Sequence, residues 1–424
     1  MMAGHGKPRW GQPLTGIIAL FTFTFVALVI WWIFVDPRGP FHTYEQPFLA
    51  FMAWMILVGL WQHLLFGDYP FQNLTPPKRL LVETAINLAG VWFIINVVFG
   101  QFLGKLSMPF WSSDALHQSL PKLDHHHVNE VVGSALTLFV LIGFFTYAFW
   151  TIAFQKWPFA GLKQPALGLA EWSLCTVFTV ILFGILIFPH FATYLVNKEF
   201  FGGTIWWKGL SSAIAGTSAT VNFNIGWYEW CIVYLFMTAN VWEGKPWDIV
   251  KSQPWRGIFA TVSIFVLALI TVKVLMAVMA SIYGPVDPQA KDGIMSLDYR
   301  YYHTATLAGF TLIPFLIWNH YFDNWPKQWG VVAGWIIRTI GVFVAAAIIG
   351  IIYYRVCEPL LGLPSVFANT PVEYNGMHLN NKPLVWLFWW IIPLLWNDWF
   401  AKKWPFYVDE SRHVEHKTGR GFHA

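Results

Sequence analysis

Five apolar runs of this chain end in nearly the same short phrase, in which a tryptophan is followed within a few residues by a proline. The five copies are Trp61…Pro70, Trp150…Pro158, Trp242…Pro246, Trp318…Pro326 and Trp396…Pro405. Proline ends a helix, tryptophan prefers the membrane interface, and neighbouring lysines reach toward lipid headgroups. A helix end that recurs in this way predicts one repeated structural unit, with every copy of the phrase on the same side of a membrane.

The composition places the chain in a lipid bilayer. Apolar residues make up 56% of it and charged residues 11%, whereas a soluble domain has about a quarter of its residues charged. Apolar stretches of roughly 18 to 25 residues recur, and each can cross a hydrocarbon core about 30 Å thick. The net charge of +4 comes mostly from loops and the tail, so a nucleic acid is not expected as a partner.

These stretches predict an all-α, polytopic integral membrane protein with about ten transmembrane helices. The predicted spans are 14–35, 46–66, 81–103, 131–154, 167–195, 226–242, 256–283, 301–320, 330–354 and 384–400. We expect a single transmembrane domain over 1–424, built from parallel two-helix hairpin repeats. An N-terminal helix at 14–35 precedes hairpins at 46–103, 131–195, 226–283 and 301–354, and a last half-repeat at 384–400 precedes a basic cytoplasmic tail at 407–424.

The basic residues predict the orientation of the spans. With the N-terminus inside, sixteen of the 26 Lys and Arg residues fall on the inner side, nine fall on the outer side, and Lys273 lies within a span. Inner loops of membrane proteins carry such an excess of positive charge. We therefore expect an inner (cytoplasmic) membrane protein with both termini and all five Trp-Pro phrases on the cytoplasmic side.

Two charged side chains are expected inside the bilayer. Lys273 is about ten residues from the outer end of its span, hence roughly 15 Å deep. Glu229 lies on the preceding span of the same hairpin, and antiparallel packing places it within one helical turn of Lys273. A buried ion pair is predicted, which is either structural or a substrate-binding or proton-handling site.

Other polar residues recur at equivalent places in the repeat. Glu83 and Glu171 each follow the proline of their phrase by thirteen residues, near the cytoplasmic start of the next helix. They are interpreted either as carboxylates that interact with the helix dipole or as part of an inner gate. One shared position within the phrase is occupied by His63, Asn240, His320 and Asp398. These four side chains are expected to converge at the inner face if the repeats pack around a common axis.

Histidines are the candidate ligands for a metal or haem. An outer loop carries His117 and the run His125, His126 and His127, where neutral imidazoles could bind Cu or Zn. Consecutive histidines point in different directions, so an ordinary loop cluster is the alternative. Haem would need facing pairs, such as His63 with His320 or His190 with His303, but these residues lie at the ends of spans.

The function is predicted as a choice between classes. The chain contains no nucleotide-binding or hydrolase motif, so no catalytic residue is assigned and transport would be secondary or passive. The first hypothesis is a secondary transporter or channel for a small solute that uses the Lys273–Glu229 pair. The alternative is a membrane subunit of a redox or other multi-subunit complex that docks an extracytoplasmic subunit and binds metal, quinone or haem. A membrane enzyme ranks third, and a homo-oligomer stays open.

Overall fold

The computed structural model describes residues 6–36, 38–41, 45–106, 108–191, 218–290, 293–326, 330–361 and 382–408. Apart from the two-residue strands β1 (Lys7–Pro8) and β2 (Tyr407–Val408), which pair antiparallel, the elements of these residues are helices. Most of the tail predicted at 407–424, together with residues 192–217, lies outside the described residues.

The helices follow one another along the whole described chain. The α-helices are α1 (Leu14–Phe34), α2 (Glu45–Leu60), α3 (Pro76–Phe93), α4 (Gly104–Leu106), α5 (Ser113–Ser119), α6 (His125–Ile152), α7 (Ala166–Leu186), α8 (Phe188–Phe191), α11 (Ser218–Phe236), α12 (Trp255–Tyr283), α13 (Leu297–His320), α14 (Val331–Leu361) and α15 (Lys382–Trp399). Wider π-helical segments extend three of them, namely η1 (Trp61–Leu65), η2 (Ile94–Leu103) and η5 (Met237–Val241). Short 3₁₀ turns occur at η3 (Pro109–Trp111) and η6 (Trp247–Ile249).

Seven helices of the described chain are long and apolar enough to cross a membrane. They are Leu14–Phe34, Phe48–Leu65, Pro76–Leu103, His127–Ile152, Ala166–Leu186, Trp255–Tyr283 and Val332–Tyr353. This result confirms the predicted all-α, multi-pass class. The other three predicted spans coincide with α11, α13 and α15, which are not among these seven helices.

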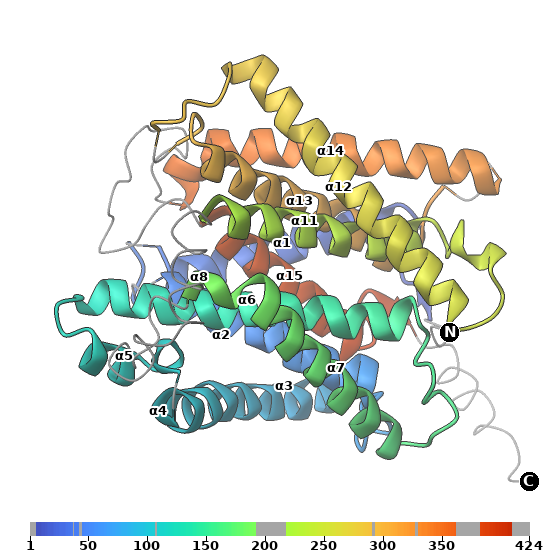
Figure 1. Ribbon diagram of the computed structural model, residues 1–424. Coiled ribbons are helices and arrows are strands. Elements are labelled where there is room, and N and C mark those ends of the chain that lie inside the picture. The colour runs from blue at the N-terminus through green and yellow to red at the C-terminus, as the bar shows by residue number, and fades with distance from the viewer. Residues whose placement is uncertain are drawn as a thin grey trace, which may run out of the picture.

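Five helices form a closed inner ring. Contacts run from α2 to α6, from α6 to α11, from α11 to α13, from α13 to α15, and from α15 back to α2. Each of these inner helices packs mainly against one outer helix, and the pairs are α2 with α3, α6 with α7, α11 with α12, α13 with α14, and α15 with α1. In Figure 1, α12 and α14 lie along the top and α3 and α7 along the bottom, with inner helices between them.

The outer helices carry the apolar surface of the molecule. Among the described side chains of the five inner and five outer helices, the large exposed apolar ones lie on outer helices, apart from Leu297 at the first position of α13. Examples are Phe21, Leu81, Val177, Val262 and Val344, which are 53–72% exposed. Water would make such an extended apolar surface unfavourable, whereas lipid tails are as apolar as the side chains. The outer helices therefore present the surface that suits a bilayer.

The five Trp-Pro phrases fold into turns with one backbone conformation. In every copy the X–Pro bond is cis, and the residues two and three positions before the proline have φ between 50° and 83°. In every copy the N–H of the residue two positions before the proline donates to the carbonyl six residues earlier, with N···O distances of 2.7–3.1 Å. The residue pairs with positive φ are Gly67 and Asp68, Gln155 and Lys156, Glu243 and Gly244, Asp323 and Asn324, and Lys402 and Lys403.

Side chains at the start of four outer helices bind the ends of neighbouring inner helices. Each donates to a backbone carbonyl that lies five residues before a turn proline. The three glutamine amides are Gln164 on Leu65 (2.6 Å), Gln253 on Ala153 (3.0 Å) and Gln12 on Tyr321 (2.7 Å), and the Arg79 guanidinium bonds Phe400 in the same way (3.1 Å). These bonds join α7 to the end of α2, α12 to α6, α1 to α13, and α3 to α15.

A glycine four residues after each of these glutamines lets the helices approach closely. A Cβ atom added at the glycine would come within 2.4 Å of a phenylalanine ring that precedes the neighbouring turn proline by four residues. The contacts are Gly168 on Phe66, Gly257 on Phe154 and Gly16 on Phe322. The sequence Gln-Pro-x-x-Gly therefore predicts one contact between helices. The glutamine donates a hydrogen bond to a backbone carbonyl of the neighbouring helix end, and the glycine leaves space for a phenylalanine ring of that helix end.

We expect Gly168→Ala to destabilise the protein by about 1–3 kcal/mol, because the new methyl group overlaps the Phe66 ring. The measurement is the midpoint of thermal unfolding of the purified protein in detergent. Gly184→Ala on the same helix is the matched control, since nothing lies within 4 Å of the added Cβ there. Equal unfolding midpoints for the two variants would contradict the docking contact.

Candidate functional site

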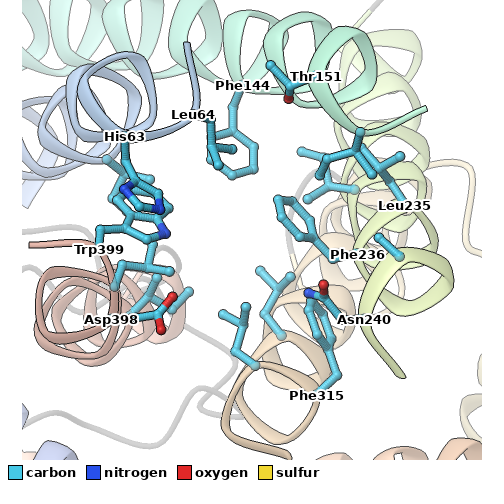
Figure 2. A pocket seen from close by; sticks show the side chains of 18 of the residues that line it. His63, Leu64, Phe144, Thr151, Leu235, Phe236, Asn240, Phe315, Asp398 and Trp399 are labelled. Atoms are coloured by element: carbon cyan, nitrogen blue, oxygen red, sulfur yellow. The ribbon is translucent and has the colours of Figure 1, made fainter. Parts of the chain in front are cut away.

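A cavity of about 2110 Å³ lies between the inner helices, and all five of them supply side chains to its wall. Figure 2 shows Leu64, Phe144, Leu235, Phe315 and Trp399 around its open centre. Leu64 belongs to η1, which continues α2, and the other four lie on α6, α11, α13 and α15. The ring of five inner helices therefore encloses the cavity.

The middle of the cavity wall is apolar. The residues fourteen positions before the five turn prolines all line it, and these are Ile56, Phe144, Ile232, Leu312 and Ile391. Aromatic rings continue the wall toward the turns, where Phe236 stacks with Phe144 at 5.8 Å and with Phe315 at 6.2 Å between ring centroids. A solute in this section meets hydrocarbon and aromatic surface.

The end of the cavity next to the turns is polar. His63, Asn240, His320 and Asp398 all line the cavity. They do not share one position relative to the turn, since His63 and Asp398 precede their turn prolines by seven residues and Asn240 and His320 precede theirs by six. Figure 2 shows His63 and Asp398 on one side and Asn240 on the other. The inner ring brings the four predicted residues to one cavity because they end equivalent helices. Their functional role stays a prediction.

His63 is held by an acidic residue of its own turn. Its Nδ1 lies 2.9 Å from Asp68 Oδ1, and its ring stacks on Trp399 with 5.6 Å between centroids. The other oxygen of the Asp68 carboxylate lies 3.2 Å from Arg79 Nη1. Arg79 in turn bonds the carbonyl of Phe400, so this cluster links α2, α3 and α15.

His320 and Asp398 form the second acidic contact of this end. His320 Nδ1 lies 2.8 Å from Asp398 Oδ2, and both side chains are buried. Lys403 Nζ lies 3.7 Å from the other Asp398 oxygen. Near them the Asn324 side chain donates to the Asn240 carbonyl at 3.0 Å, which joins the ends of α13 and α11. Ion pairs and a hydrogen bond therefore connect neighbouring helices at the polar end of the cavity.

The structure separates Lys273 from Glu229, so the predicted ion pair is absent among the described residues. Glu229 lines the cavity and is 9% exposed, whereas Lys273 is exposed on α12 with its Nζ 5.8 Å from the centre of the Phe223 ring. Antiparallel packing of α11 and α12 sets the depth of the two residues. It does not set the direction of each side chain around its helix, and the two point to different surfaces.

Glu83 and Glu171 are buried at helix contacts and do not line the cavity that the described residues form. Glu83 accepts a hydrogen bond of 2.7 Å from Gln62, whose own oxygen accepts one of 2.9 Å from Asn87. Glu171 lies 3.5 Å from Lys156 Nζ. Both carboxylates therefore connect an outer helix to an inner helix or its turn.

The outer histidines do not assemble three ligands within the described residues. The rings of His117 and His125 stack with 4.4 Å between centroids, and His127 Nδ1 lies 2.8 Å from the Asp124 carboxylate at the start of α6. The side chain of His126 lies outside the described residues. This arrangement gives the chain a capped helix start, and the predicted copper or zinc site stays a hypothesis.

Sequence reasoning missed two features of the site. Asp68 and Arg79 are visible in the sequence but were not recognised as a pair, because the pairing depends on the left-handed turn between them. The recurring Gln-Pro-x-x-Gly pattern was the readable signal for docking between neighbouring helices.

The chain matches no protein-family model, no curated protein sequence and no solved structure.

We expect Asp68→Asn to lower the free energy of unfolding by about 3 kcal/mol, because it leaves the buried Arg79 guanidinium without its counter-ion. The control is Asp248→Asn in the exposed turn before α12, where a hydrogen bond from Lys245 lowers the pKa of the carboxyl. Solvent screens that pair, so little change is expected. Thermal unfolding of both variants checks this, and an unchanged midpoint for Asp68→Asn would refute the role of the pair.

Proposed function

We propose that this protein is a secondary transporter or channel that passes a small solute through the central cavity. The main observation that supports this proposal is the closed ring of five inner helices around a cavity of about 2110 Å³. A packed helix bundle fills its interior with side chains and leaves few voids larger than a water molecule. A cavity of this size that runs between inner helices is suited to hold or conduct a solute.

We propose that the protein has ten membrane spans, namely the seven apolar helices together with α11, α13 and α15. These three are inner helices, so outer helices shield them from lipid and they can carry polar residues. The spans form five two-helix repeats, of which the fifth pairs the last helix with the first, as the contact of α15 with α1 and the pairing of β1 with β2 support.

The proposed orientation places the five turns at the cytoplasmic face of the inner membrane, with both termini on that side. Basic residues support it, since Lys156, Lys245, Lys402 and Lys403 all lie in the turns. The polar end of the cavity, with His63, Asn240, His320 and Asp398, then faces the cytoplasm. Glu229 lies farther toward the outside.

The roles of the charged residues follow from their places. Glu229 is the proposed substrate or coupling residue, because its carboxylate faces the cavity. Lys273 is exposed on an outer helix, where a lysine can extend its amine toward the headgroups. Glu83 and Glu171 stabilise contacts between helices in this proposal, in place of the inner gate that their spacing suggested.

We expect Leu64→Trp to reduce solute passage strongly, because Leu64 points into the cavity (Figure 2) and the indole would obstruct it. Liposomes that contain the protein are mixed with choline chloride, sodium chloride, glycerol or sodium glutamate to create a concentration gradient across the membrane. Light scattering then follows the change in liposome volume. Leu81→Trp is the matched control, since Leu81 is 72% exposed on α3.

Passage of at least one of these solutes above protein-free liposomes, lost in Leu64→Trp and retained in Leu81→Trp, supports the proposal. Passage that is equal in both variants and in protein-free liposomes for every solute would contradict it. Thermal unfolding of each variant confirms that it is folded before the comparison is made.

A further inference from the structure

One carboxylate stands within the apolar section of the cavity wall. Along α11 the residues that line the cavity include Asn222, Ile225, Glu229, Ile232 and Leu235, which follow one face of the helix. Glu229 therefore projects from the same face as Ile225 and Ile232. It is a polar group on a surface that is otherwise suited to hydrocarbon.

Glu229 is nine-tenths buried, being 9% exposed. No hydrogen bond or ion pair to its carboxylate is formed by the described residues, and Lys273 lies elsewhere. Removing a carboxylate from water costs several kcal/mol unless another group compensates the charge. A side chain held in this way inside a cavity points to a positively charged partner that arrives from outside the chain.

The rest of the wall argues for an organic cation. The cavity-lining residues that stand as far from their turn prolines as Glu229 does are Ala53, Leu141 and Phe388, and none of them offers an oxygen atom. A metal cation needs several oxygen ligands to replace its water shell. An ammonium group with an apolar body needs one carboxylate, and aromatic faces such as that of Phe388 attract its charge.

The two ends of the cavity differ in charge. At the end away from the turns the charged residues that line the described cavity are Glu130 and Asp298. Near the turns and the β1–β2 strand pair, the five basic lining residues (Arg9, Arg79, Lys156, Arg256 and Lys402) outnumber the three acidic ones (Asp68, Glu243 and Asp398). Carboxylates that line a cavity raise the local concentration of cations and repel anions. The end with Glu130 and Asp298 therefore favours the same sign of charge as Glu229.

We propose that the central cavity binds a monovalent organic cation, with the positive group at Glu229 and the apolar part against the hydrophobic wall. This inference rests on the proposed function and names the class of its substrate. The cation enters from the end with Glu130 and Asp298 and reaches Glu229 before the apolar ring of Ile56, Phe144, Ile232, Leu312 and Ile391.

The test measures binding to the purified full-length protein in lipid nanodiscs. The probes are benzyltrimethylammonium, whose charge does not change with pH, and its neutral and anionic counterparts, benzyl alcohol and benzenesulfonate. Isothermal titration calorimetry compares the native protein with Glu229→Gln, which keeps the side-chain shape. Asp248→Asn, in the turn before α12, is the control because it removes one carboxylate charge from a residue that does not line the cavity.

We expect benzyltrimethylammonium to bind more tightly than the other two probes, and Glu229→Gln to weaken its binding by at least about tenfold. Asp248→Asn should bind it as the native protein does. The thermal unfolding of Glu229→Gln should be no earlier than that of the native protein, because the variant removes an uncompensated buried charge.

Equal binding of benzyltrimethylammonium by Glu229→Gln and by the native protein would overturn the inference, as would equally tight binding of benzenesulfonate. The proposed function is judged separately by the liposome experiment. Passage of glycerol or glutamate that Leu64→Trp blocks, with no cation binding, rejects the substrate class and keeps the transporter. Cation binding at Glu229 with no passage of any solute rejects transport and keeps the site.

Discussion

The carbonyl groups at the turn ends of the inner helices are the constraint on which the ring depends. Where a helix ends at a left-handed turn, the carbonyl five residues before the turn proline has no donor from the turn backbone. Next to a bilayer, such a group must find a partner within the protein. Gln164, Gln253, Gln12 and Arg79 supply that partner from the adjacent unit, so four of the five inner helix ends are completed only when the neighbour is in place.

This mutual dependence explains why the inner and outer helices carry different kinds of residues. The outer helices meet lipid and are apolar on their exposed faces, and three of them begin with the glutamine and glycine that dock onto a neighbour. The inner helices meet protein on one side and the cavity on the other. They can therefore carry Glu229, His320 and Asp398, which would be costly on a surface exposed to lipid.

Several parts of the structure could be predicted from the sequence because they depend on local chemistry. The proline and tryptophan phrases placed the turns, and a location six or seven residues before the turn proline brought His63, Asn240, His320 and Asp398 to one cavity. The pairing of Lys273 with Glu229 failed, because hairpin geometry predicts depth but not rotation about the helix axis. The buried places of Glu83 and Glu171 depend on which helix covers which, and that information is not local.

The central claim is that the inner ring encloses a cavity open to water and that the outer helices face lipid. Thr151, which lines the cavity beside the turns, and Thr22, which is exposed on α1, are replaced singly by cysteine in a variant without native cysteines. Inside-out membrane vesicles are then treated with a charged, membrane-impermeant thiol reagent. The account predicts rapid modification of Thr151→Cys and none of Thr22→Cys. Protection of Thr151→Cys, or equal modification of both, would contradict it.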